Sequence, residues 1–159
     1  MKTYKFNKIL FLLLTSYFLL GCGYEPLLNV KNQNFGITKV VLEGNKRLGG
    51  LLRNNLIVSK KKENSLTLTI KANKKNEISN KNDTGKVLKY AVSLNFEITA
   101  VSDKNGEIAL SQVYSRKENY DAADVHIDTL NNEKKAVEIM IESIANEILI
   151  SLSSIYQEK

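Results

Sequence analysis

The sequence predicts an α+β fold, a two-layer sandwich with two helices packed on one face of a four-stranded mixed sheet. Three observations lead to it. Two segments alternate apolar and polar residues with a period of two, a glycine turn follows the longer of them, and the C-terminal segment repeats apolar residues at helical spacing. The expected order is strand, helix, strand, strand, strand, helix. A chain of 159 residues, 43% of them hydrophobic, suits one such domain.

The first expected elements are a short strand and a helix. Residues 37–42 form a run rich in β-branched residues that ends at Gly44, which predicts a strand. Asn45 is placed to cap a helix with apolar residues at Leu48, Leu51, Leu52, Leu56 and Ile57. Gly49 and Gly50 each weaken this helix by roughly 1 kcal/mol relative to alanine, so it requires tertiary packing.

The next three elements are strands. Residues 66–71 alternate strictly, which predicts a half-buried strand. A longer alternation follows over residues 88–100, and Asp103–Gly106 then supplies turn residues, with Gly106 able to take positive φ. A return strand from Glu107 toward Tyr114 completes an antiparallel hairpin. The apolar face of the longer strand holds Leu88, Tyr90, Val92, Leu94, Phe96, Ile98 and Ala100.

The last expected element is a long amphipathic helix from Asn132 to Ile155. Its apolar stripe favours packing on the sheet over a membrane-surface role, because its polar face lacks the basic enrichment of lipid-binding helices. The stripe consists of Ala136, Met140, Ile141, Ile144, Ala145, Ile148, Leu152 and Ile155.

The N-terminus has the pattern of a bacterial lipoprotein signal. Basic residues in 2–8 precede an apolar run, Ile9–Leu20, which is too short to span a bilayer and fits a cleaved signal peptide. Leu19–Cys22 resembles a lipobox, so we expect cleavage after residue 21 and lipidation of Cys22. The alternative is a buried or free cysteine after an ordinary signal peptide. Residues 22–35 would form a lipid-anchored tether and residues 36–159 the domain. Gly23, in place of the aspartate that favours inner-membrane retention, favours the outer membrane.

Charge and composition argue against several functions. The whole chain carries a net charge of +6, but removal of residues 1–21 leaves 20 basic against 17 acidic residues, or +3. That charge is too small for a general nucleic-acid binder. Cys22 and His126 are the only residues of their kinds, which argues against an internal disulfide, a Cys-rich zinc site or a multi-histidine metal centre. No Ser-His-Asp or Cys-His motif is present, so we expect no enzyme activity and no cofactor.

Lysines form two clusters. The segment from Lys71 to Lys89 is expected to join the second and third strands and has a local excess of four positive charges. Lys74, Lys75, Lys81 and Lys86 are candidate phosphate contacts, with a solvated Lys/Asn-rich loop as the alternative. Lys60–Lys62 are expected at the opposite end of the sheet, beside the Asp103–Gly106 turn.

A small acidic cluster precedes the last helix. It consists of Asp121, Asp124, His126 and Asp128. If the segment is extended, the last three share one face, but three ligands along one strand do not converge on a divalent cation without a turn. A strand edge or loop with outward polar residues is the simpler interpretation, and no metal site is expected.

Three features of the chain form one set: the string Cys22–Leu27, the hairpin from Gly106 through Arg116 to Tyr120, and the terminal helix from Glu133. Together they resemble the lipopolysaccharide-assembly lipoprotein LptE family of alphaproteobacteria. The resemblance implies two helices on one face of a four-stranded sheet, and a role inside the LptD β-barrel of the outer membrane, assisting barrel assembly and lipopolysaccharide delivery. Two alternatives remain, a periplasm-facing envelope lipoprotein that binds a protein or peptide, and an acyl or small-molecule carrier.

Overall fold

The expected fold class is confirmed by the computed structural model, which describes residues 34–56 and 64–157. The described residues belong to one compact unit, Asn32–Lys159. The elements are β1 (Phe35–Gly44), α2 (Lys46–Asn55), β2 (Asn64–Lys81), β3 (Val87–Ser102), β4 (Ile108–Asp121) and α3 (His126–Gln157). The signal peptide, Cys22, Ile57 and Lys60–Lys62 lie outside the described residues.

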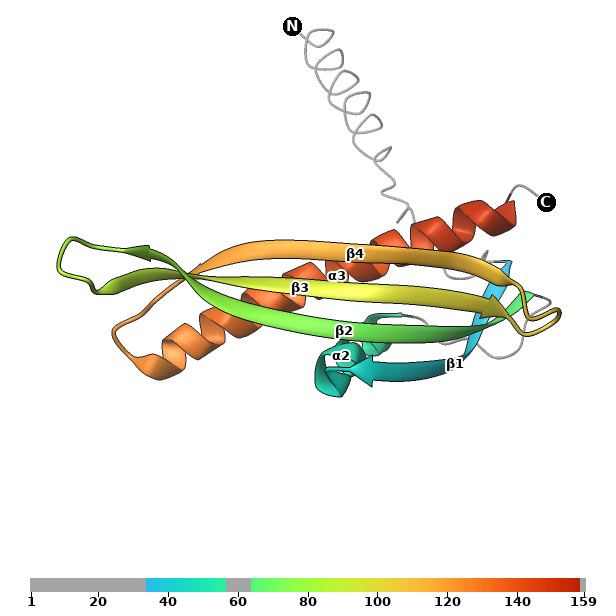
Figure 1. Cartoon of the computed structure of the whole chain (residues 1–159), viewed down its shortest axis with the longest axis horizontal. Helices are drawn as coiled ribbons and strands as arrows, with labels where there is room; N and C mark the ends of the chain where they lie inside the picture. The colour runs from blue at the N-terminus through green and yellow to red at the C-terminus, as the bar shows by residue number, and fades with distance from the viewer. Residues whose placement is uncertain (1–33, 57–63, 158–159) are drawn as a thin grey trace, which may run out of the picture. The chain divides into compact units, whose positions relative to one another are not determined.

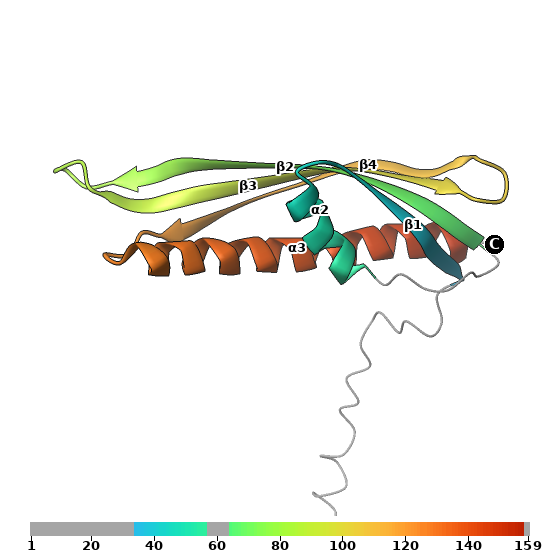
Figure 2. The same cartoon turned by 90° about the horizontal axis from the view of Figure 1, so that it is seen from below.

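The sheet has the strand order β1-β2-β3-β4. β1 pairs with β2 in parallel, and the other two pairings are antiparallel. A parallel pair requires a crossover between its strands, and α2 lies in that connection. Both helices lie on one side of the sheet, as Figure 2 shows, so that in Figure 1 the other face is turned to the viewer.

The hairpin of β2 and β3 is longer than its alternating sequence predicts. β2 was expected over residues 66–71 but continues to Lys81, so the lysine-rich segment is mostly strand and not loop. The register pairs Lys71 with Glu97 and Lys75 with Ser93 on β3. Lysine and asparagine have low strand propensity, but pairing with the strongly alternating β3 outweighs that preference.

The core lies between the sheet and the two helices. Phe96 and Ile98 of β3 and Ile144 and Ile148 of α3 belong to this layer, and all four are at most 1% exposed. Val137 and Leu149 are also buried and widen the predicted stripe of α3. Two residues assigned to apolar faces are instead exposed, Leu88 (42%) at the start of β3 near the hairpin tip, and Leu51 (40%) on the outer side of α2.

The local signals at the start of α2 are confirmed. Gly44 has φ of +65°, and the Asn45 side chain accepts a hydrogen bond from the Leu48 backbone N–H at 3.0 Å. Gly49 faces the sheet, where an added Cβ would lie 3.2 Å from Leu42 Cδ2. The absence of a side chain at Gly49 therefore lets the helix approach β1 closely.

α3 begins six residues before its predicted start at Asn132. His126 and Asp128 lie in its first turns, Asp124 lies in the preceding loop, and Asp121 ends β4. The extended-segment interpretation of this acidic cluster is therefore wrong. Thr129 stabilises the turn between β4 and α3, because its Oγ1 accepts a hydrogen bond from the Ala123 N–H at 2.9 Å. The helical periodicity of the sequence does not reveal this contact.

Candidate functional site

A polar network joins three elements near the hairpin end of the domain. Lys74 and Asn76 point inward from β2, Tyr120 from β4, and all three reach Glu133 on α3. Lys74 forms an ion pair with Glu133 Oε1, Asn76 Nδ2 donates to the same oxygen at 2.9 Å, and the Tyr120 hydroxyl donates to Oε2 at 3.2 Å. The side chains of Lys74 and Glu133 are only 28% and 15% exposed. Both carboxylate oxygens of Glu133 are therefore engaged by donors from the sheet.

The network changes the acidity of its members. Burial raises the pKa of Glu133, but the hydrogen bonds from Lys74 and Asn76, together with the charge of Lys74, outweigh burial and lower it overall. Burial, followed by the charge of Glu133, raises the pKa of Tyr120 to about 12. At neutral pH the carboxylate is thus charged and the phenol is neutral, which is the pairing that their hydrogen bond requires.

A pocket of about 470 Å³ opens beside this network. The Tyr90 and Tyr120 rings stack in its wall with centroids 5.6 Å apart, and Leu130 and His126 of α3 line the opposite side. Its lining is mixed, with aromatic faces beside amide and carboxylate groups. This chemistry suits a polar group with one apolar face better than an acyl chain.

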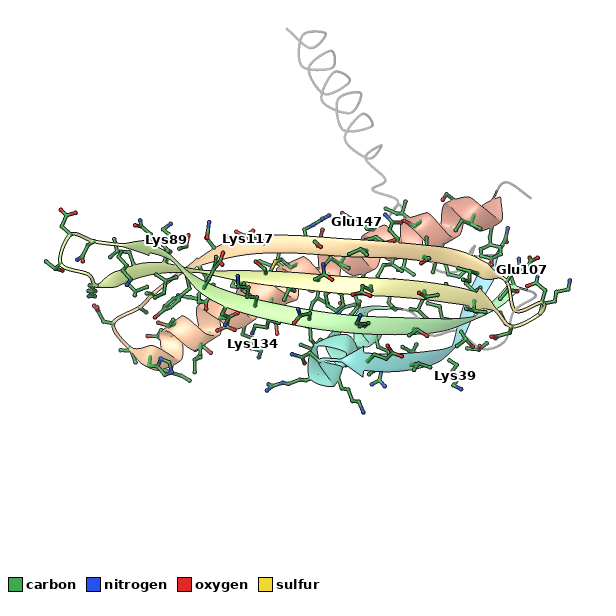
Figure 3. All side chains as sticks on the ribbon, in the orientation of Figure 1. Lys39, Lys89, Glu107, Lys117, Lys134 and Glu147 are labelled. Carbon is green, nitrogen blue, oxygen red and sulfur yellow. The ribbon has the colours of Figure 1, made fainter. Side chains whose placement is uncertain are left out.

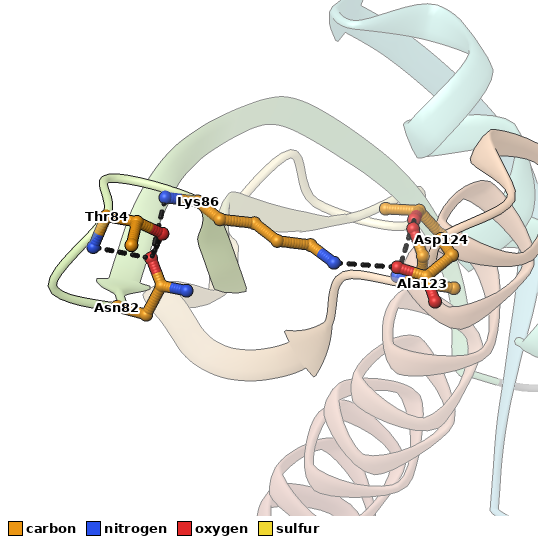
Figure 4. Close-up of polar contacts among 6 residues, drawn as sticks. Asn82, Thr84, Lys86, Ala123 and Asp124 are labelled. Atoms are coloured by element: carbon orange, nitrogen blue, oxygen red, sulfur yellow. Dashed lines mark hydrogen bonds and ion pairs between the residues drawn. The ribbon is translucent and has the colours of Figure 1, made fainter.

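The hairpin tip is held against the loop before α3. Asn82 Oδ1 accepts hydrogen bonds from the backbone N–H groups of Thr84 (3.2 Å) and Lys86 (2.8 Å), which shapes the turn (Figure 4). Lys86 Nζ then reaches Asp124 Oδ1 at 2.8 Å. This contact raises the pKa of Lys86 and lowers that of Asp124, through the hydrogen bond first and the charges second. Both groups are largely exposed, so the pair adds little stability.

The four lysines predicted to contact phosphate do not converge on one site. Lys74 points inward to Glu133, whereas Lys75 lies on the opposite face of β2 with its Nζ 3.3 Å from Glu77 Oε2. Lys81 is exposed at the end of β2 and forms no ion pair with any described residue, and Lys86 is at the tip. Alternation along a strand sends neighbouring side chains to opposite faces, which explains the separation.

The sheet face away from the helices is polar across β2, β3 and β4. Figure 3 shows the side chains that project from it, with Lys117 labelled on β4. Asn95 Nδ2 donates to Ser115 Oγ at 2.8 Å, and Lys71 lies 3.1 Å from Glu97. Lys117 and Lys75 both bind Glu77, and these hydrogen bonds, that of Lys117 first, lower the pKa of that carboxyl. No helix of the described domain covers this face, which we call the open face.

Sequence reasoning missed the Glu133 network. The period-two pattern of β2 continues through Ala72 to Lys74 and Asn76, where polar residues replace apolar ones, and this was the available signal. The partner residue is 59 positions away from Lys74, beyond the reach of any local pattern. Within the described residues, no group of three or more His, Cys, Asp or Glu side chains is arranged to hold a metal ion.

No family model and no curated protein matches the sequence. Solved structures are similar in fold. A proposed lipoprotein from Caulobacter crescentus CB15 superposes with a TM-score of 0.60 at 18% identity, covering 77% of this chain and 92% of that one. Rare lipoprotein B from Shewanella oneidensis gives 0.55 at 17% identity, covering 76% and 97%. An uncharacterised lipoprotein B from Nitrosomonas europaea gives 0.59 at 16% identity, covering 85% and 93%.

These comparisons show that the chain shares its fold with bacterial lipoproteins, two of which are of the lipoprotein B type. At this level of identity the likeness establishes the fold alone. None of the described helices is both long enough and apolar enough to cross a membrane.

Proposed function

We propose that this chain is a non-catalytic lipoprotein of the outer membrane, anchored through Cys22 on the periplasmic face, that plugs and helps assemble an LptD-like β-barrel and assists lipopolysaccharide transport and insertion. The motif resemblance around Cys22 and Arg116 supports this proposal, and so does the fold likeness to rare lipoprotein B. The observation that carries the proposal is this fold with its open face.

The open face suits a plug because the lumen of a large barrel is polar. It carries serine, threonine and asparagine side chains, and several of its charges, such as Lys71 with Glu97, are already paired. A surface of this kind can meet a polar wall through hydrogen bonds without burying unpaired charge. The same face would also suit a soluble polar partner, so the barrel must be tested directly.

The test is purification of the intact, membrane-extracted protein with identification of what accompanies it. We expect a stable one-to-one complex with a large outer-membrane barrel. Depletion of the lipoprotein should leave that barrel misassembled and lower lipopolysaccharide at the cell surface. Normal barrel folding and normal surface lipopolysaccharide after depletion would instead support the alternative, an envelope lipoprotein that binds another protein or peptide.

Contact with lipopolysaccharide phosphates is the finer part of this proposal. Lys81 is exposed and forms no ion pair with a described residue, and Lys75 and Lys86 form only exposed ion pairs, to Glu77 and Asp124. Lys74 is instead held in the partly buried pair with Glu133. Changing the exposed three to glutamine should weaken binding of purified lipopolysaccharide and flatten its salt dependence, because exposed charge pairs are screened by salt. A variant with Lys104, Lys134 and Lys135 changed to glutamine loses the same charge elsewhere. Equal binding by both variants would favour a merely solvated lysine cluster.

A further inference from the structure

The exposed side of α2 carries positive charge that the described domain does not neutralise. Lys46, Arg47 and Arg53 are exposed on this helix, and Lys39 projects from the neighbouring edge strand β1 (Figure 3). None of these four residues forms an ion pair with a described residue. Glu43 is the only acidic residue of β1 and α2, so the two elements carry four basic residues against one acidic residue. We call the exposed side of α2 the basic face.

A glycine lies in the middle of the basic face. Gly50 follows Lys46 by four positions and Arg47 by three, and it precedes Arg53 by three, so helical spacing surrounds it with the three basic side chains. A Cβ at Gly50 would meet nothing within 4 Å. Glycine is a poor helix former, and no contact within the described domain offsets its cost here. The bare backbone at Gly50 lets a group from another molecule approach between the basic side chains.

We infer that the basic face binds a surface rich in aspartate and glutamate on the protein partner that surrounds the domain, an inference that rests on the proposed role as a plug. Taking unpaired charges out of water is costly unless the opposing surface supplies the opposite charge. The open face avoids this cost, because charges such as Lys71 and Glu97 are already paired within it. The basic face has no such internal partners, so the wall opposite α2 has to supply the carboxylates.

The place of α2 in the domain favours a protein wall over lipopolysaccharide phosphates. α2 lies on the flank of the long sheet, about midway between the hairpin tip and the opposite end (Figure 1). A long domain fits a lumen with its long axis along the barrel, so its flank faces the wall. Leu51, which is 40% exposed next to Gly50, adds an apolar contact that a folded protein surface can match. The planar guanidinium groups of Arg47 and Arg53 suit carboxylates, which they bind through two parallel hydrogen bonds.

The basic face and the open face lie on opposite sides of the sheet. α2 is on the helix side, and the open face is turned away from both helices (Figure 2). A single partner that touches both surfaces has to extend around the domain, as the wall of a lumen does. Two crosslinking sites, one on each surface, therefore test the inference and the proposed function separately.

The test uses the full-length, membrane-anchored protein in its own cells, with a photoreactive amino acid in place of Asn54 on α2 or of Val113 on β4. Both positions are exposed, and Val113 lies on the same face of β4 as Lys117. We expect both sites to crosslink to one outer-membrane barrel, and the peptide attached at Asn54 to contain aspartate or glutamate. With Lys46, Arg47 and Arg53 changed to glutamine, the Asn54 adduct should fall roughly tenfold, since each exposed ion pair contributes about two- to threefold.

Two further variants separate this contact from folding and from total charge. Gly50→Gln places a side chain in open space, so the domain should melt at or above the parent temperature while the Asn54 adduct decreases. The variant with Lys104, Lys134 and Lys135 changed to glutamine loses the same charge elsewhere and should crosslink like the parent.

The possible outcomes distinguish the inference from the proposed function. The inference would be overturned by the absence of an Asn54 adduct, by an adduct formed only with lipid or lipopolysaccharide, or by equal loss in the two charge variants. A barrel adduct at Val113 in those cases would leave the proposed function standing. Charge-dependent adducts to an acidic protein that is not a barrel would refute the proposed function and still support an acidic protein partner for α2.

Discussion

The Glu133 carboxylate links α3 to the sheet through an ion pair and two hydrogen bonds. It receives Lys74 and Asn76 from β2 and Tyr120 from β4, so one carboxylate satisfies three donors from two strands. A second junction further along α3 pairs Glu147 with Arg116 of β4, but both side chains there are more than a third exposed. Solvent screens the second pair more, so Glu133 is expected to contribute more to stability.

Glu133→Gln should lower the free energy of unfolding at pH 7 by about 1–3 kcal/mol, the range for losing hydrogen bonds to a charged group. The folded-state pKa of Glu133 lies below its ordinary value of 4.5. Its contribution is therefore complete above pH 4.5 and is lost as the pH falls through the lowered pKa. Denaturant unfolding at neutral and acid pH measures this effect. The difference in free energy of unfolding between parent and variant should become smaller as the pH is lowered. Glu142→Gln, at an exposed position of the same helix, should change stability little at either pH. Equal effects of the two substitutions would contradict the stabilising role of Glu133.

The elements differ in what stabilises them. α2 has only 10 residues with two glycines in its interior, and it depends on the Asn45 cap and on close packing against β1. α3 has 32 residues and a buried stripe along most of its length. Substitutions in α2 therefore show how helix propensity and packing against β1 each affect stability. Substitutions in α3 show how much the burial of its apolar side chains contributes to stability.

The two glycines of α2 should respond differently to alanine. Gly50→Ala should raise the free energy of unfolding by up to about 1 kcal/mol, because the new Cβ gains helix propensity and meets nothing. Gly49→Ala should gain less or lose stability, since its Cβ would lie 3.2 Å from Leu42 Cδ2. Denaturant titration of both variants measures the contrast. Equal gains would show that the approach of α2 to β1 is less tight than described.

Two isoleucines of α3 provide a matched pair for burial. Ile144 is fully buried and Ile150 is 57% exposed. Ile144→Asp should cost several kcal/mol because it places an unpaired charge in the core, whereas Ile150→Asp should cost less than about 1 kcal/mol. Thermal melts of the two variants distinguish these outcomes. Similar melting temperatures would mean that the face of α3 turned to the sheet is assigned incorrectly.

The described core is formed by residues that follow the proposed anchor in the sequence. Every core residue of the described domain lies between Phe35 and Leu152, and the two helices cover one face of the sheet while the other stays open. Because residues of β1 to α3 form the described core, we expect the domain to fold without its anchor. Membrane attachment and partner binding would then be separate properties of one chain.

Cys22→Ser should abolish incorporation of labelled acyl chains and leave the melting temperature of the domain unchanged. The acyl anchor contributes about 0.8 kcal/mol for each buried methylene to membrane binding, whereas the stability of the domain comes from the core between its sheet and its helices. Metabolic labelling with a fatty acid, together with circular dichroism of the purified protein, measures both effects. Normal acyl incorporation in the variant would refute the assignment of Cys22.

The sequence by itself determined the features that depend on near neighbours. The alternation over residues 88–100, the Asn45 cap and the positive φ of Gly106 are local, so residue type and spacing predicted them. Only the tertiary structure decided that β2 continues to Lys81 and that Lys74 and Lys75 serve opposite faces, because pairing with β3 outweighs the low strand propensity of that segment. The contact between Lys74 and Glu133 was likewise decided by folding, which brings together residues 59 positions apart that no local pattern relates.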